Sequence, residues 1–235
     1  MTDPSYLTVL GLGFVLGLRH ALDADHIAAV STVLATRPSW QASGLIGFSW
    51  GLGHTLVLLF VGAVALALQV SIPESIANAA EFAVGLMLIV LGGTLVVRVL
   101  QERWHSHSHD HGGHRHEHLH SHAVTSGHGH AHWWSDSVKP LCIGMAHGLA
   151  GSAALILVVV TASRTVLEGL AYIAVFGLGS IIGMMLIGLV LSLPVIWSLS
   201  LGRQALLMVQ GLAGLGSIGL GLSMLFRTAM GERPL

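Results

Sequence analysis

Six long apolar runs limit how this chain can fold. They lie roughly at residues 6–34, 44–70, 79–100, 140–162, 167–192 and 204–226, with proline or charged residues between them. The hydrocarbon core of a bilayer is about 30 Å thick, and a helix of about 20 apolar residues crosses it. The pattern therefore predicts an all-α integral membrane protein with six transmembrane helices.

The composition excludes several other classes of protein. Charged residues make up only 9% of the 235 residues, whereas a soluble domain carries about 25%, so a soluble enzyme and a disordered chain are excluded. Lys and Arg number 10 against 11 Asp and Glu, so no positive field attracts a nucleic acid. The single cysteine, Cys142, cannot form a thiolate cluster, and any metal is expected to have nitrogen and oxygen ligands. The partner that this composition indicates is the lipid bilayer.

Histidine is unevenly distributed. Of 16 histidines, 12 lie within residues 105–132. The other four are His20, His26, His54 and His147. In the tract, histidine alternates with small, polar and acidic residues, a composition that cannot bury a core and that binds late first-row divalent ions. We interpret residues 102–138 as a histidine-rich loop that buffers or delivers metal, between three-helix units at 1–101 and 139–235. A flexible linker with incidental metal affinity is the alternative.

The positions of Lys and Arg predict the orientation in the membrane. Six lie in the first, third and fifth loops, namely Arg37, Arg98, Arg103, Arg115, Lys139 and Arg203. Three lie on the other side, namely Arg164, Arg227 and Arg233. Because cytoplasmic loops carry the excess of positive charge, we expect a multi-pass protein of the cell inner membrane with both termini outside and the histidine-rich loop in the cytoplasm.

The two three-helix units resemble each other. GLRHALDADH, which begins at Gly17, aligns with GMAHGLAGSA, which begins at Gly144, and this pairs His20 with His147. Because three is an odd number of helices, the second unit would enter the membrane from the opposite face, which predicts an inverted 3+3 repeat. GxxxG pairs, which indicate close helix packing, occur at Gly13/Gly17, Gly47/Gly51, Gly144/Gly148 and Gly179/Gly183.

The first apolar run contains a cluster of ionisable residues, namely Arg19, His20, Asp23, Asp25 and His26. An Arg or Asp near the centre of a membrane helix costs about 2.5–3.5 kcal/mol, so these side chains are expected to face protein, water or an ion. On a regular helix, His20, Asp23 and His26 form one stripe. Asp25 lies about 140° from His20, so either Asp25 orients a histidine or the helix unwinds there. A purely structural alternative pairs Arg19 with one of the aspartates.

Two histidines outside this cluster are further candidates. His54 follows Gly51 and Gly53, which permit close approach of a helix or an ion, and His147 is a candidate through its alignment with His20. The complete set of candidate metal ligands is His20, Asp23, Asp25, His26, His54 and His147. Imidazole and carboxylate without thiolate suit divalent nickel, cobalt, zinc, manganese or iron, with affinity rising from manganese through cobalt to nickel.

At these residues the sequence resembles the nickel/cobalt transporter superfamily. RHALDADHI at residues 19–27 fits the family signature RHAxDADHI throughout, and LGHTLVL at 52–58 approximates the second motif, LGHSTVV. The resemblance implies that the metal-recognition site consists of His20, Asp23, Asp25, His26 and His54. Longer members carry an acidic LGFDTATE motif where this chain has HGLAGSAA at 147–154. The short layout is similar to urease-accessory-type nickel permeases, and the histidine-rich loop is similar to that of efflux members.

We therefore expect a permease for Ni²⁺ or Co²⁺, with no enzymatic activity and no permanently bound cofactor. A cytoplasmic nickel chaperone is the partner expected at the histidine-rich loop. The residues alone leave two other classes open. One is a membrane-anchored metal storage or sensor protein in which the tract is the active part, and the other is an intramembrane metallohydrolase with an open position for water. The direction of transport is open as well.

Overall fold

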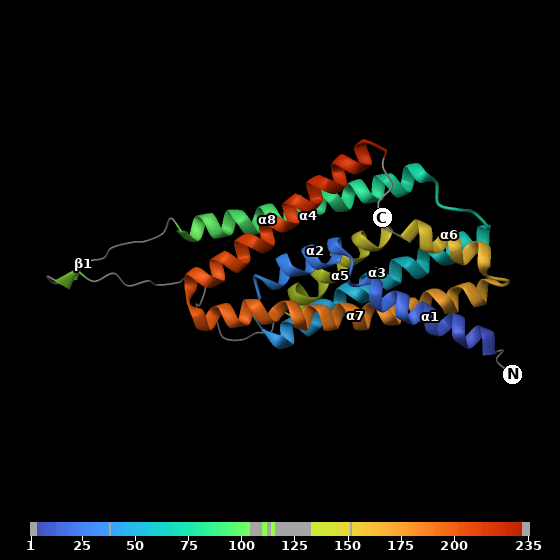
Figure 1. Cartoon of the computed structure of the whole chain (residues 1–235), viewed down its shortest axis with the longest axis horizontal. Helices are drawn as coiled ribbons and strands as arrows, with labels where there is room; N and C mark the ends of the chain where they lie inside the picture. The colour runs from blue at the N-terminus through green and yellow to red at the C-terminus, as the bar shows by residue number, and fades with distance from the viewer. Residues whose placement is uncertain are drawn as a thin grey trace.

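The computed structural model describes residues 4–37, 39–103, 110–111, 114–115, 133–150 and 152–231. The helices in this part of the chain are α1 (Pro4–His20), α2 (Ala24–Leu34), α3 (Trp40–Leu68), α4 (Glu74–Arg103), α5 (Trp133–Leu149), α6 (Ser152–Ala162), α7 (Val166–Leu201) and α8 (Arg203–Ala229). Two-residue strands in the histidine-rich loop, β1 (Asp110–His111) and β2 (His114–Arg115), pair in antiparallel fashion; the rest of the tract lies outside the described residues. The helices form an elongated bundle (Figure 1). The helical fold predicted from the apolar runs is confirmed.

In the described part of the chain, four helices are long and apolar enough to cross a membrane, namely α3, Glu74–Gln101 of α4, α7 and α8. The pair α1 and α2 provides a fifth span if it is counted as one helix with a 54° bend. The predicted run at 140–162 falls on α5 and α6, and the residue between them, 151, lies outside the described residues. The predicted end of α7 at residue 192 is too early, because the helix continues through Pro194 to Leu201. Membrane helices tolerate an internal proline where neighbouring groups satisfy the freed carbonyl.

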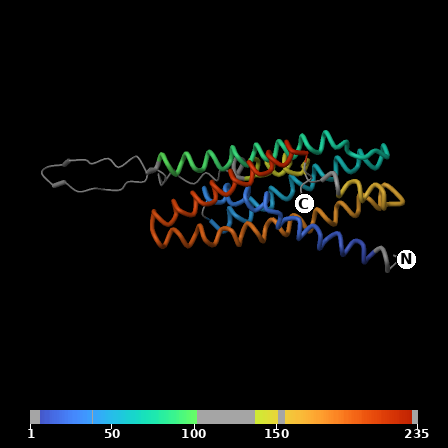
Figure 2. Tube along the Cα trace, turned by 45° about the horizontal axis from the view of Figure 1, so that its top comes forward, coloured from blue at the N-terminus to red at the C-terminus, as the bar shows by residue number. Residues whose placement is uncertain are grey.

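The long helices pack in two pairs, α3 with α7 and α4 with α8. The shorter helices then lie against the first pair, with α1 on α7 and α5 on α3. α2 lies against α4, α7 and α8 as well as α3, and the side chain of Gln210 in α8 donates a 2.8 Å hydrogen bond to the carbonyl of Ala35 at its end. Figure 2 shows α4 and α7 along opposite edges of the bundle. This packing encloses α2 on several sides.

Glycines permit the close helix crossings. A Cβ atom at Gly17 of α1 would collide with the backbone carbonyl of Phe176 in α7, and one at Gly144 of α5 would collide with the carbonyl of Trp50 in α3. In each of the four predicted GxxxG pairs, at least one glycine meets the backbone of a neighbouring helix in this way. The close packing predicted from these pairs is therefore confirmed.

A buried apolar cluster surrounds the bend between α1 and α2. Its members are Ala21, Ala29, Val30, Leu34, Ile46, Trp50, Val84, Leu88, Ala150 and Met184. By contrast, the side chains of Phe60, Leu167 and Leu212 are 71%, 77% and 72% exposed, as expected of surfaces that face hydrocarbon instead of water. Ala21 at the start of the bend and the buried residues of α2 are thus held in the interior, whereas Leu22, Asp23 and Ala24 are exposed. The outer faces of the long helices are left for lipid.

Candidate metal centre

The helix break places the acidic residues of the first run. α1 ends at His20, and α2 begins at Ala24. Asp23 has an extended backbone (φ −62°, ψ 143°), and its carbonyl accepts a 3.1 Å hydrogen bond from the amide of Ile27, which starts α2. Asp25 then lies in the first turn of α2, where the helix dipole stabilises a carboxylate. The helix is unwound between His20 and Ala24, as one alternative for Asp25 required, and Asp25 also lies against ring nitrogens of two histidines, as the other required.

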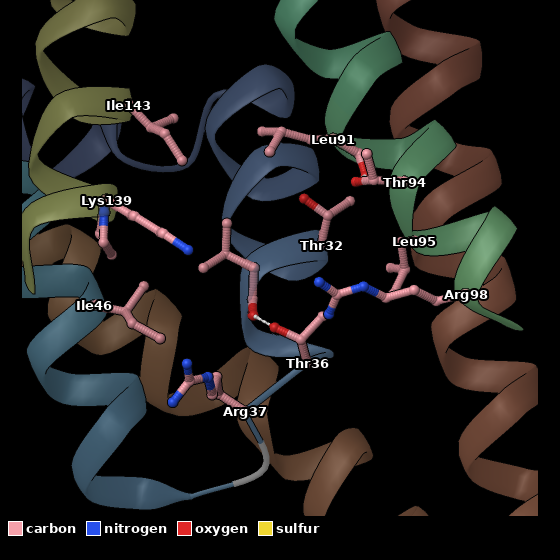
Figure 3. Close-up of a pocket in the computed structure, with 12 residues that line it drawn as sticks. Thr32, Thr36, Arg37, Ile46, Leu91, Thr94, Leu95, Arg98, Lys139 and Ile143 are labelled. Atoms are coloured by element: carbon pink, nitrogen blue, oxygen red, sulfur yellow. Dashed lines mark hydrogen bonds between the residues drawn. The ribbon is translucent and has the colours of Figure 1, made fainter. Parts of the chain in front are cut away.

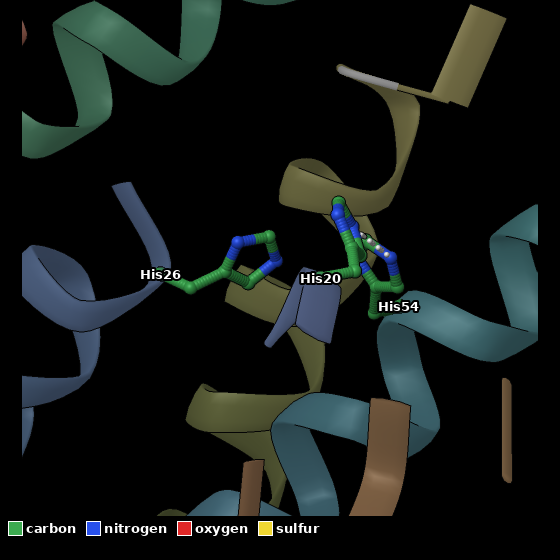
Figure 4. Close-up of side chains that lie close together, drawn as sticks. All are labelled: His20, His26 and His54. Carbon is green, nitrogen blue, oxygen red and sulfur yellow. Dashed lines mark hydrogen bonds between the residues drawn. The ribbon is translucent and has the colours of Figure 1, made fainter. Parts of the chain in front are cut away.

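His20, His26 and His54 form the first group of candidate ligands. One nitrogen of each lies within 4.8 Å of one nitrogen of the other two, and the Nε2 atoms of His20 and His54 are 3.2 Å apart. The ring centroids are 4.7 Å apart for His20 and His26, and 5.3 Å for His26 and His54. Figure 4 shows the rings of His20 and His54 beside each other, with the ring of His26 directed toward them. Three imidazoles from three helices therefore converge.

A second group of candidate ligands consists of Asp25, His26 and His147. One ligand atom of each residue lies within 4.8 Å of one ligand atom of the other two. Oδ2 of Asp25 lies 2.9 Å from Nε2 of His147, and Oδ1 lies 3.2 Å from Nδ1 of His26. The centroids of the His26 and His147 rings are 4.2 Å apart. Because His147 belongs to α5, this group joins the two halves of the chain. His26 belongs to both groups.

Three of these histidines are buried with a ring nitrogen unpaired. His26, His54 and His147 are each 1% exposed. Within the described part of the chain, His26 Nε2, His54 Nδ1 and His147 Nδ1 have no hydrogen-bond partner. Buried polar atoms in proteins almost always have a partner, and a neutral imidazole nitrogen with a free lone pair is a ligand for divalent transition metals. Each of these three nitrogens can therefore bond a metal ion without the loss of an existing hydrogen bond.

Glycines bring His147 to the first half. A Cβ atom at Gly53 of α3 would collide with the carbonyl of Leu141 in α5, and one at Gly148 would lie 2.9 Å from the carbonyl of His54. Side chains at these positions would push α5 away from α3 and would separate His147 from His26.

Asp23 lies outside both groups. Its Oδ2 atom lies 2.7 Å from Nδ1 of His20, and its side chain is 52% exposed. A carboxylate on one ring nitrogen orients the other nitrogen of the imidazole toward a metal, and here Nε2 of His20 faces His54. Arg19 is exposed, and Asp23 and Asp25 both bond to histidines. The purely structural alternative requires an ion pair between Arg19 and one of these aspartates, and the contacts of the described residues do not include it.

Glu81 of α4 is a carboxylate near the site that the sequence analysis did not single out. It is partly buried within the membrane-spanning part of α4, the helix that packs on α2, and it interacts electrostatically with Asp25. The available signal was an acidic residue inside the apolar run at 79–100, since ionisable groups at membrane depth are rare.

Comparison with known proteins identifies the family to which the chain belongs. Residues 6–199 match the family NicO, described as high-affinity nickel-transport protein. The urease accessory protein UreH of Bacillus sp. (strain TB-90) is 33% identical over 194 residues, which cover 83% of this chain and 80% of that protein. No solved structure matches the chain. The chain belongs to the NicO family of high-affinity nickel-transport proteins, which are multi-pass membrane transporters and not enzymes.

Proposed function

We propose that this chain is a permease that carries Ni²⁺ or Co²⁺ across the cell inner membrane through a site at the bend between α1 and α2. The observation that carries the proposal is the pair of ligand groups that share His26 and contain unpaired, buried ring nitrogens. Ionisable residues at membrane depth mark ion pathways, and a set of imidazoles and carboxylate suits both metals. The metal is the transported substrate.

One ion at a time is the simplest occupancy of the two groups. Nδ1 of His26 is already bonded to Asp25, so Nε2 is the nitrogen left to bond a metal, and it cannot serve two ions. In this proposal the imidazoles come from His20, His26, His54 and His147, and Asp25 supplies or orients a ligand. Asp23 holds His20 in place.

The packing supports an inverted repeat of two three-helix units. In such a repeat α1 corresponds to α5, and α3 corresponds to α7. The contact of α1 with α7 then has an equivalent in the contact of α5 with α3, and both contacts are present. In the sequence alignment Gly85 corresponds to Gly214 and Gly92 to Gly221. The contact of Gly85 with Gly221 and the contact of Gly92 with Gly214 are therefore equivalent in the two units. Both contacts occur between α4 and α8. In this proposal α5 and α6 together form the sixth span, and rocking of one unit against the other exposes the site to each side in turn.

The orientation follows from the charge distribution. Both termini are outside, and the histidine-rich loop at 102–138 lies in the cytoplasm between the units at 1–101 and 139–235. There the tract acts as a metal buffer, and a cytoplasmic nickel chaperone is the partner to which it delivers or from which it receives the ion.

Uptake of radioactive nickel into liposomes that contain the purified protein tests the proposal. The variants are His54→Ala and a chain in which the 12 tract histidines are replaced by serine. Leu56→Ala is the matched control, because this α3 side chain lies two residues from His54 and is 47% exposed. Cobalt and zinc are added as competitors.

We expect His54→Ala to abolish flux, and the serine tract and Leu56→Ala to preserve it. Protein-dependent flux that is unaffected by His54→Ala would reject the proposed site. If no flux occurs under a metal or a proton gradient, and tight nickel binding is lost with the tract histidines, the chain is a storage or sensor protein and the permease proposal is wrong.

A further inference from the structure

A cavity lies away from the candidate ligand histidines, near the end of the bundle that carries the histidine-rich loop. Its volume is about 250 Å³, and its walls come from α2 and the segment after it, α3, α4 and α5. Thr32 of α2 lines it, which places it about two helical turns beyond His26. It is thus separate from both candidate ligand groups.

The cavity is lined by three cations and by no carboxylate. Arg37 follows α2, Arg98 lies near the end of α4, and Lys139 lies in the second turn of α5. No Asp or Glu is among its lining residues. In Figure 3 the side chains of Lys139 and Arg98 extend into the space from opposite sides, with Arg37 below them. Two cations that enter one space from α4 and α5, with a third at its edge, can hold an anion between them.

Three threonines are the other polar side chains of the lining, and they supply no free donors; the remaining six lining residues are apolar. The hydroxyls of Thr32, Thr36 and Thr94 donate to the carbonyls of Ala29, Val33 and Leu91 at 2.7 to 2.8 Å. Recognition of an anion in this cavity therefore depends on the charged side chains, and the hydroxyls contribute little. This division of roles can be tested.

We propose that this cavity binds a phosphate-type oxyanion through Arg98 and Lys139, with Arg37 at its edge. Guanidinium and ammonium groups are the standard partners of phosphate oxygens. Basic pockets between membrane helices near the cytoplasmic surface bind anionic lipid headgroups. Arg98 lies in the last turn of the membrane-spanning part of α4, which ends at Gln101. The headgroup of an anionic phospholipid and free phosphate present the same chemistry, and the two sources are separated by experiment.

The full-length protein in neutral detergent is titrated with phosphatidylglycerol in one arm and with inorganic phosphate in the other. Binding is measured by native mass spectrometry and by the rise in unfolding temperature. The variants are Arg98→Gln, Lys139→Gln and the charge-conserving pair Arg98→Lys with Lys139→Arg. Two controls are Arg203→Gln, at the exposed first residue of α8, and Thr36→Val inside the cavity.

Saturable binding of phosphatidylglycerol that weakens about fivefold in each Gln variant supports a lipid site, since a basic residue near the membrane surface contributes about 1 kcal/mol to binding an anionic lipid. The same pattern with inorganic phosphate, and no saturable lipid binding, supports a site for a free oxyanion. In both cases the charge-conserving pair and the two controls retain binding. The proposal is overturned if the native chain and both Gln variants bind phosphatidylglycerol with equal affinity and also bind inorganic phosphate with equal affinity. This result does not depend on the outcome of the nickel flux experiment.

Discussion

The two halves of the chain begin with the same pattern of helix lengths but differ in the residues at the break within it. Each begins with a helix of 17 residues that is followed by one of 11 residues, α1 and α2 in the first half and α5 and α6 in the second. Asp23 and Asp25 lie at the break in the first half, whereas the aligned positions in the second half hold Ala150 and Ser152. His147 is the candidate ligand from the second half, and it reaches Asp25 across the interface.

This difference shows that the helix break and the acidic residues beside it have separate explanations. A break occurs in the second half with no acidic residue at the aligned positions, so carboxylates are not needed to end a helix at this place in the unit. Buried ionisable groups in a membrane are costly. We infer that those of the first half are kept for the ligand set, and that the second half supplies the packing surface and one imidazole.

His26→Ala tests the first half with the largest expected effect. This side chain belongs to both ligand groups, so its loss is expected to lower nickel affinity by more than about a hundredfold, beyond the range for residues that only orient a ligand. Titration calorimetry on the serine-tract background measures it. Leu22→Ala, at an exposed site in the break, is the control. Affinity within about tenfold of the parent would remove His26 from the site.

His147→Ala tests whether the second half contributes to binding. The loss of one imidazole and of the partner of Asp25 Oδ2 is expected to lower nickel affinity about 10- to 100-fold. The same calorimetry applies, and Met145→Ala, on the same helix and 39% exposed, is the control. Unchanged affinity in His147→Ala would show that the first half binds the ion alone and that His147 has a packing role.

Gly17→Ala and Gly144→Ala test the likeness of the two halves. Each added Cβ would meet a backbone carbonyl of a long helix, and we expect both variants to lose a similar amount of stability, about 1–3 kcal/mol for an overpacked contact. Unfolding in detergent measures the loss. Gly11→Ala is the control, because nothing lies within 4 Å of a Cβ atom there. Destabilisation by one variant only would argue against equivalent packing of the two units.

Asp23→Asn tests whether Asp23 orients the ring of His20 or binds the metal ion itself. The amide keeps the size of the side chain but removes the charge that holds Nδ1 of His20 at 2.7 Å, so nickel affinity is expected to fall by about tenfold, as for other residues that orient a ligand. Asp25→Asn, made in parallel, is expected to have the larger effect, because Asp25 belongs to a ligand group. The reverse order would make Asp23 the direct ligand.

Much of the fold was predictable because its signals are local. An apolar run of about 20 residues predicts a membrane helix wherever it occurs, and GxxxG pairs predicted close crossings that the structure contains at all four pairs. The unwound segment was one of two alternatives that followed from the angle between Asp25 and His20 on a regular helix. These inferences needed only neighbours in the chain.

The remaining features depend on contacts between distant segments. Asp25 and His147 are 122 positions apart, and the alignment of the halves selected His147 without indicating its partner. The cavity at Arg98 and Lys139 joins four helices, so the linear charge pattern showed cations on one side of the membrane but not their convergence. Glu81 was missed because a single acidic residue in an otherwise apolar run has no local partner to mark it.

Replacement of the 12 tract histidines by serine is expected to have the smallest effect on transport. None of the candidate ligands lies in the tract, and serine preserves its length and its inability to form a core, so the initial rate of nickel uptake is expected to stay within about twofold of the parent. The number of nickel ions bound at equilibrium falls, because most of the imidazoles are gone. Stopped-flow flux and equilibrium dialysis on one preparation separate these quantities. A collapse of the initial rate would make the tract part of the transport path and would place essential chemistry outside both halves.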